Sequence, residues 1–366
     1  MLTFITTALL ILIATLVGIV IWYFSFFSKD PSYIAEYAKR GINSKDVSLV
    51  IKRNNTTLLS INPHAVIPLA STVKIIIALE YAHQVRHGSI TEDDTVSKET
   101  LDKFYVKDTD GGAHQSWLES HNFKSVYTLK EVVIGMMAYS SNANTDYLIK
   151  LLGSENINEV PARLELKQHS AVYPIVSALY VPNYIKHKEQ LDSNERVNRL
   201  VSMSQEEYMK LCYSIQQDMM DGADQPYLQE EVDLDLPLQK NWSDRLPSSS
   251  ASDYLRIMEL INSRTFFDSN MQICIEEVMG HTIMRNEKNR SWLKYAGYKG
   301  GSTHYIHTCA AFATDLQGNK TEIVFLSNQL DDFSRKKLNV NLNQFILKVL
   351  SDAHFRKKLS LMATIV

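Results

Sequence analysis

The sequence predicts an α+β fold, an α/β sheet domain built from both ends of the chain with an all-helical domain inserted between them. Near the N-terminus, the run Val47–Ile51 has the two-residue alternation of side chains that is typical of a strand. Asn54–Asn55 then supplies a turn, and Leu58–Ile61 supplies a second strand, which together predict a β-hairpin. Near the C-terminus, Tyr305–Thr314 and Thr321–Ser327 predict a second hairpin. Most of the chain between the two hairpins has the apolar spacing of helices.

The order of these elements sets the expected domain organisation. We predict one main domain over residues 29–366, because no repeat or low-complexity tract divides it. Its sheet part comprises about 42–70 and 295–353, and its helical part comprises about 71–290. Within the helical part, Lys107–Phe123 reads as a loop, since it contains several Asp and Gly residues.

The first segment predicts a single-pass membrane anchor over residues 1–28. The run from Leu2 to Phe27 has 26 residues and no charged side chain, and ~20 apolar residues suffice to span a bilayer. Trp22 and Tyr23 fit an interfacial aromatic belt. A cleaved signal peptide, the alternative, usually has a basic start and a small-residue exit, which this run lacks. We expect the main domain to lie on the extracytoplasmic side.

Composition excludes several classes of function. The net charge is only -3 and the basic residues are scattered, so we expect no nucleic-acid partner. The three cysteines, Cys212, Cys274 and Cys309, are an odd number without metal spacing, which excludes a complete disulfide framework. His304 and His307 are three residues apart on an expected strand, which places them on opposite faces. We therefore expect no metal and no cofactor.

Three short motifs suggest covalent catalysis by a serine. They are Ser71–Lys74 at the start of an apolar helix, Ser140–Asn142 between two helices, and Lys299–Ser302 leading into a strand. Positions i and i+3 share a helix face, so the amine of Lys74 lies near the hydroxyl of Ser71. A lysine activates a serine when its surroundings favour the neutral amine.

The remaining motif residues suit the recognition of an acyl substrate. The hydroxyl of Ser140 is suited to relay a proton to a leaving group, and the amide of Asn142 to hold a substrate carbonyl or the lysine. Gly301 lets a substrate approach a strand edge closely. Lys299 offers a cation for a substrate carboxylate.

Each motif on its own has decoys in this chain. Ser334–Lys337 repeats the SxxK spacing, Ser60–Asn62 and Ser154–Asn156 repeat SxN, and Lys39–Gly41 repeats KxG. The context separates them, because only Ser71 begins a long apolar helix directly after a hairpin and a proline.

Together the motifs resemble the SxxK, SDN and KTG signature of class A β-lactamases and penicillin-binding proteins. The similarity covers about Ile42 to Leu350. It implies the β-lactamase/transpeptidase-like fold and a serine hydrolase that forms an acyl-enzyme with a β-lactam, amide or ester.

The resemblance also implies a role for each residue of the site. Ser71 is acylated, Lys74 shuttles protons, and Ser140 protonates the leaving nitrogen. Lys299 binds a carboxylate, and the backbone N–H groups of Ser71 and Ser302 form the oxyanion hole. The implied substrate is a small molecule or peptide that is β-lactam or peptidoglycan-like.

The sequence departs from the class A pattern at three places. Ser141 replaces an Asp and Gly300 replaces a Thr or Ser. Class A enzymes also carry a Glu-x-x-Leu-Asn motif whose Glu activates the deacylating water. The corresponding region here, near Tyr173–Ala178, has no carboxylate, while Glu165 lies too early and Glu189 too late. We therefore expect acyl transfer but not efficient β-lactam hydrolysis.

Two alternatives remain open at this point. One is another enzyme of the same fold, a D-alanyl-D-alanine carboxypeptidase or an esterase, which the missing Glu favours. The other is a membrane-bound penicillin-binding sensor that is acylated once and stays acylated, which the anchor and the long segment at about 186–247 allow.

Overall fold

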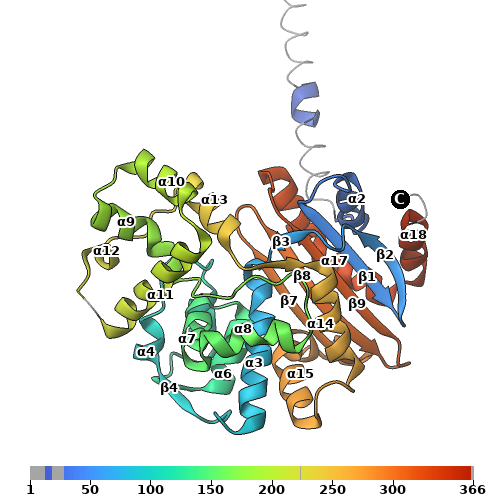
Figure 1. Cartoon of the computed structure of the whole chain (residues 1–366). Helices are drawn as coiled ribbons and strands as arrows, with labels where there is room; N and C mark the ends of the chain where they lie inside the picture. The colour runs from blue at the N-terminus through green and yellow to red at the C-terminus, as the bar shows by residue number, and fades with distance from the viewer. Residues whose placement is uncertain (1–12, 19–28, 223, 364–366) are drawn as a thin grey trace, which may run out of the picture.

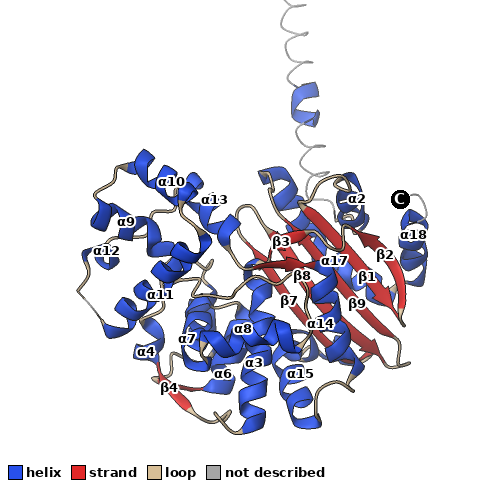
Figure 2. Cartoon of the chain, in the orientation of Figure 1, coloured by secondary structure: helices blue, strands red, loops and turns tan. Residues whose placement is uncertain are grey.

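The protein contains a five-stranded antiparallel sheet in the order β2-β1-β9-β8-β7. A computed structural model describes residues 13–18, 29–222 and 224–363. The mixture of this sheet with many helices confirms the predicted α+β class (Figure 2). The strands of the sheet are β1 (Val47–Arg53), β2 (Thr56–Ile61), β7 (Leu293–Ser302), β8 (His307–Asp315) and β9 (Lys320–Ser327).

The two predicted hairpins lie side by side in this one sheet. Strand β1 pairs antiparallel with β9, so that Val50 lies opposite Val324. An ion pair of 2.9 Å joins Arg53, at the end of β1, to Asp315, at the end of β8. Strands that are distant in sequence thus form the centre of the sheet, and β7 becomes an edge strand that faces the helices.

Both faces of the sheet are covered by helices (Figure 1). In β8 and β9, Cys309 and Phe325 face the cluster formed with the terminal helices, whereas Phe312 and Val324 face the opposite cluster. Strands buried on both faces read as nearly continuous apolar runs. The covering helices are α2 (Ser32–Arg40), α17 (Asp332–Ser351) and α18 (Ala353–Ala363) on one face, and α14 (Ala251–Ser263) and α15 (Ser269–Met284) on the other.

Helix α3 (Lys74–His87) runs through the middle of the helical part. Its first nine residues, Lys74–Ala82, are all buried, because helices and the sheet surround it. The helices that contact it are α7 (Asn142–Leu152), α8 (Ser154–Arg163) and α15, and α6 (Leu129–Ile134) packs on α7 and α15. Shorter elements nearby are β3 (Val66–Pro68), which pairs with β6 (Ser248–Ser250), β4 (Thr95–Ser97), which pairs with β5 (Val126–Thr128), α4 (Lys98–Asp102) and α16 (Glu287–Arg290).

The prediction of a loop over Lys107–Phe123 is wrong for its second half. Residues Ala113–Ser120 form helix α5. The carboxylate of Asp110 accepts hydrogen bonds from the first N–H groups of this helix, and the ring of Trp117 is fully buried beneath it. Burial of one large aromatic side chain outweighs the weak helical preference of the Gly-rich start.

The long polar segment after α8 forms a separate helical cluster with its own apolar core. Tyr173 closes this core, and its hydroxyl donates to the carbonyl of Arg245 at 2.7 Å. In Figure 1 the cluster stands beside the β7 edge of the sheet, on the far side from α18. Its helices are α9 (Val181–Glu189), α10 (Ser193–Ser202), α11 (Gln205–Asp221), α12 (Pro226–Gln229) and α13 (Leu236–Arg245).

Among the residues that the structure describes, no helix has the length and apolar character needed to cross a bilayer. The predicted anchor, residues 1–28, lies outside those residues except for 13–18, which are helical.

Candidate active site

Ser71 lies in a short 3-10 turn, η1 (Ala70–Val73), that leads directly into α3. Ala70 has a φ of 45°, a left-handed conformation that is uncommon outside glycine. The turn is tied to the sheet because the hydroxyl of Thr308 on β8 donates to the carbonyl of Leu69 at 2.7 Å and lies 2.8 Å from the hydroxyl of Thr72. The backbone around the serine is therefore fixed against the sheet.

Lys74 is fully buried and its amine points at the Ser140–Asn142 turn. Its Nζ donates to the carbonyl of Ser140 at 2.7 Å and to Oδ1 of Asn142 at 2.8 Å, and it lies 3.3 Å from Oγ of Ser140. A neutral amine has two N–H groups and one lone pair. The two acceptors use both N–H groups, so the lone pair remains for a hydroxyl.

Ser140 occupies a strained turn between α6 and α7. A π-helical turn, η2 (Gly135–Tyr139), precedes it, and Ser140 itself has a φ of 72°. Turns of this kind, and left-handed non-glycine residues, gather at functional sites. Ser141 then caps α7, since its Oγ accepts a hydrogen bond from the N–H of Asn144 at 3.2 Å.

His114, which the sequence analysis did not single out, supports this turn from behind. Its Nδ1 shares a hydrogen bond of 2.9 Å with Oγ of Ser141, and the ring is fully buried. Burial lowers the pKa of His114, which favours the neutral ring. His114 thus contacts the position at which the class A pattern has an Asp. No local signal identifies it, because the contact joins α5 to a turn 27 residues away.

Lys299, on strand β7, approaches the hydroxyl of Ser140 from the side of the sheet. Its Nζ lies 3.1 Å from Oγ of Ser140 and 2.9 Å from the carbonyl of Gly300. Burial, together with the nearby Lys299 ammonium, lowers the pKa of Lys74 well below its usual range. Burial also lowers the pKa of Lys299 to about 7. Two lysine amines therefore flank one serine hydroxyl, in surroundings that favour neutral amines.

Gly301 brings the edge strand β7 directly against Ser71. A methyl group at this position would stand 2.5 Å from the backbone nitrogen of Ser71 and 2.8 Å from the carbonyl of Leu69. Only a glycine permits this approach. The next residue, Ser302, pairs with His307 on β8 at the end of the strand.

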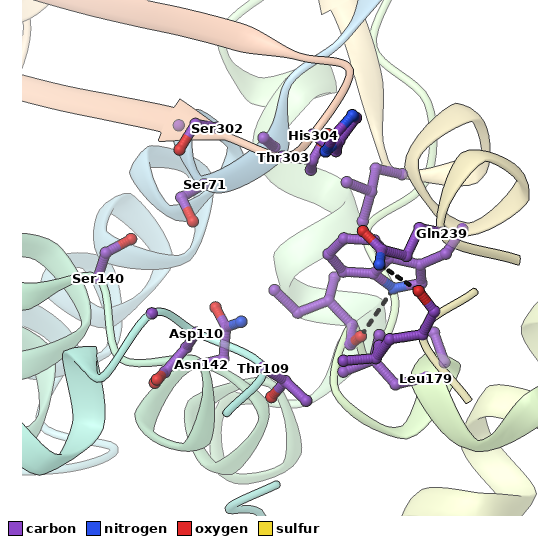
Figure 3. A pocket seen from close by; sticks show the side chains of 18 of the residues that line it. Ser71, Thr109, Asp110, Ser140, Asn142, Leu179, Gln239, Ser302, Thr303 and His304 are labelled. Atoms are coloured by element: carbon purple, nitrogen blue, oxygen red, sulfur yellow. Dashed lines mark hydrogen bonds between the residues drawn. The ribbon is translucent and has the colours of Figure 1, made fainter. Parts of the chain in front are cut away.

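Five of the seven predicted site residues line one cavity of about 590 Å³, and the other two, Lys74 and Lys299, contact one of those five. Both lysines reach the hydroxyl of Ser140 from outside the cavity lining. In Figure 3, Ser71, Ser140 and Ser302 lie close together at one end of this cavity. The residues that line it include Ser71, Ser140, Asn142, Gly301 and Ser302.

Asp146 fixes the segment in which class A enzymes carry their Glu. Its carboxylate accepts hydrogen bonds from the backbone N–H groups of Ile175 and Val176, both at 2.9 Å, and of Ser177 at 3.2 Å. Burial raises the pKa of Asp146 to about 7, despite these three donors. Asp146 lies one helical turn after Asn142 on α7, a spacing that could have suggested its place behind the site.

The carboxylates at the cavity come from elsewhere in the chain. Asp108, Asp110 and Asp233 line it, and none of them belongs to the segment that Asp146 holds. Glu165 and Glu189 each pair with a surface arginine and do not line the cavity. A carboxylate at the place expected for a class A water-activating base is therefore absent from the described residues.

Comparison with known proteins agrees with this geometry. A protein-family model described as the beta-lactamase enzyme family matches residues 32–293. The chain belongs to the β-lactamase enzyme family. It is accordingly a β-lactamase-like hydrolase, and the resemblance noted in its motifs is confirmed. A search of curated proteins finds no match.

Solved structures show the same fold at low sequence identity. A β-lactamase from Sphaerobacter thermophilus has a TM-score of 0.55 and 15% identity, with 88% of this chain and 97% of that chain covered. A β-lactamase from Chitinophaga pinensis has a TM-score of 0.53 and 14% identity, with 87% of this chain and 99% of that chain covered. A mutant of PBP-A, solved as an acyl-enzyme complex with penicillin G, has a TM-score of 0.51 and 14% identity, with 87% of this chain and 96% of that chain covered. These likenesses confirm the predicted β-lactamase/transpeptidase-like fold.

Replacing Lys299 by methionine should stabilise the protein. The unfolded chain keeps this lysine protonated up to about pH 10, whereas burial lowers its folded-state pKa to about 7. Folding therefore carries a penalty that is largest at pH 7 and below and disappears as the pH rises toward 10. We expect Lys299→Met to raise the free energy of unfolding at pH 7 by on the order of 1 kcal/mol or more, and less at pH 9.

Urea unfolding at several pH values measures this effect. Lys294→Met is the matched control, because Lys294 is exposed on the same strand. A Lys299→Met protein less stable at pH 7 than the Lys294→Met protein would contradict the penalty.

Proposed function

We propose that the chain is a serine acyl hydrolase in which Ser71 forms an acyl-enzyme. Oγ of Ser71 attacks an amide, ester or β-lactam carbonyl and gives its proton to Nζ of Lys74. The C–N or C–O bond then breaks, and a proton passes through Oγ of Ser140 to the leaving group. Water later hydrolyses the ester on Ser71, which releases the acid and restores the hydroxyl.

The observation that supports this most directly is the place of the Ser140 hydroxyl. It lies 3.3 Å from Nζ of Lys74 and 3.1 Å from Nζ of Lys299, and both amines are buried. A base near the nucleophile and a hydroxyl between that base and the leaving group make a short path for a proton. The close approach of Gly301 to Ser71 adds a strand edge whose N–H at Ser302 would serve the oxyanion.

The substrate class follows from Lys299. A substrate carboxylate beside this amine would favour its charged form, because an opposite charge raises the pKa of a lysine. A β-lactam or a peptidoglycan-like peptide ending in a carboxylate meets this requirement. That a PBP-A mutant was solved as an acyl-enzyme with penicillin G supports penicillin as a first probe.

We expect a fluorescent penicillin or a fluorophosphonate to label Ser71 alone. Ser71→Ala should abolish labelling, and Lys74→Ala should slow it about 10²- to 10⁴-fold, the usual effect of losing a general base. Intact mass and peptide mapping measure the adduct. Ser334→Ala is the matched control, since Ser334 has the same SxxK spacing on the exposed start of α17. An adduct on Ser334, or labelling of Ser71→Ala, would overturn the proposal.

Deacylation is the step for which this site is least equipped. The segment held by Asp146 has no carboxylate, and Asp146 itself is buried with its carboxylate bonded to three backbone N–H groups. This favours the second candidate function, a penicillin-binding protein that is acylated once. A D-alanyl-D-alanine carboxypeptidase or an esterase remains compatible, if Lys74 serves both steps.

With a chromogenic cephalosporin we expect a burst of about one equivalent followed by slow turnover. The physical reason is that the segment held by Asp146, in which class A enzymes carry their water-activating Glu, has no carboxylate. Stopped-flow absorbance gives the burst, and intact mass gives the lifetime of the adduct. Steady turnover on the order of 10 per second, an ordinary enzyme rate, would refute slow deacylation. Loss of that turnover in Asp110→Asn would assign the missing base to Asp110.

The same proposal includes membrane attachment through residues 1–28, with the catalytic part on the extracytoplasmic side. The uncharged run Leu2–Phe27 is the basis of this proposal. We expect the full chain to resist alkaline carbonate extraction and to be accessible to external protease. An arginine at the centre of the run, as in Leu16→Arg, should weaken retention, because it costs about 3 kcal/mol at mid-membrane. Complete release of the unmodified chain by carbonate would contradict the anchor.

A further inference from the structure

The cavity at Ser71 has two chemically different ends. Polar side chains, including Ser71, Ser140 and Asn142, line one end. Figure 3 shows Leu179 and Gln239 at the opposite end, with Thr303 and His304 along the rim between them. Apart from the polar Gln239 and Asn241, the helical cluster and the segment before it supply six apolar side chains to the lining: Ile175, Leu179, Leu200, Leu234, Leu238 and Trp242.

These apolar residues come from the long segment between the second and third motifs. Leu200 lies on α10, Leu238 and Trp242 lie on α13, and most of the six belong to or pack on the apolar core of that helical cluster. The indole N–H of Trp242 donates to the carbonyl of Ile175 at 3.3 Å. The polar atom of the ring is therefore already bonded, and the ring offers an apolar surface to the cavity.

This apolar wall is attached to the catalytic strand. Oγ of Ser243 on α13 donates to Oγ1 of Thr303 at 3.0 Å, and Thr303 directly follows Ser302. The hydroxyl of Tyr305 donates to the carbonyl of Leu236 at 3.2 Å. The start of α13 is thus held against the turn that ends β7, so the apolar end lies at a fixed position relative to Ser71.

Charge at the cavity disfavours a charged group in the apolar end. Within the described part of the chain, no Lys or Arg lines the cavity. Asp233, the carboxylate in the wall segment, is neutralised by Arg196 at 3.1 Å. An anion would find no partner there, and burying an unpaired charge is costly. An apolar group instead gains by leaving water.

We propose that the apolar end is an acyl chamber that holds an alkyl chain on the acyl side of the bond that Ser71 attacks. Lys299 and Ser140 lie at the polar end, where the leaving group receives its proton, so the acyl half points toward Thr303 and the chamber. The inference rests on the proposed acyl-enzyme and specifies its substrate class: esters or amides of a medium-length aliphatic acid, with the leaving half near Lys299.

The rate of acylation by p-nitrophenyl esters tests the chamber. We expect the octanoate to acylate the full chain, in phospholipid nanodiscs, at least tenfold faster than the acetate, with p-nitrophenolate released and the octanoyl group found on Ser71 by mass. Leu234→Asp should remove most of this preference, because Leu234 lines the cavity yet is 37% exposed and tolerates a polar side chain. Val201→Asp is the matched control, since Val201 is 69% exposed and does not line the cavity.

Binding of octanoate and acetate to Ser71→Ala, measured by calorimetry, separates the chamber from the chemistry. We expect octanoate to bind at least tenfold more tightly than acetate, and Leu234→Asp to abolish the difference. Equal binding of the two acids, or the same loss in Val201→Asp, overturns the chamber while Ser71 acylation stands. Tight octanoate binding without acylation by any ester supports the chamber and overturns the proposed function.

Discussion

The site depends on the burial of two lysine amines around one serine hydroxyl. Amines that keep their charge are expensive to remove from water, so the fold must enclose Lys74 and Lys299 firmly enough to shift both pKa values downward. The enclosure explains why α3 is buried on every side at its start, why η2 ends in a left-handed Ser140, and why β7 presses against η1. Burying these two amines lowers the stability of the fold, and the same burial favours their neutral form.

Much of this arrangement could be predicted from the sequence, because it is encoded locally. The alternation of Val47–Ile51 gives a strand, and the context of Ser71 at the head of an apolar helix separates it from Ser334. The antiparallel pairing of both hairpins in one sheet follows from simple packing rules. The seven predicted residues come together because each motif lies at the start or end of an element, and β7, which carries the third motif, packs on η1 beside Ser71.

What the sequence did not reveal depends on contacts between distant segments. His114 became relevant only when α5, read as a loop, placed its ring on Ser141. Asp146 has no motif of its own, and its role in holding Ile175 through Ser177 appears only when that segment folds back on α7. The apolar wall near Trp242 belongs to a segment whose composition is polar, since its few apolar residues are gathered on one side by folding.

The joining of both chain ends in one sheet has a consequence for biosynthesis. Ser71 and Lys74 leave the ribosome early, but the strands β8 and β9 that complete their surroundings follow much later in the chain, and β1 cannot pair with β9 until Ser327 has emerged. Pairing across such sequence distances is slow. A nascent or truncated chain that ends before Leu293 therefore carries Ser71 without the edge strand β7 that lines its cavity. The surroundings that lower the pKa of Lys74 and Lys299 can form only after strands β7, β8 and β9 have been made.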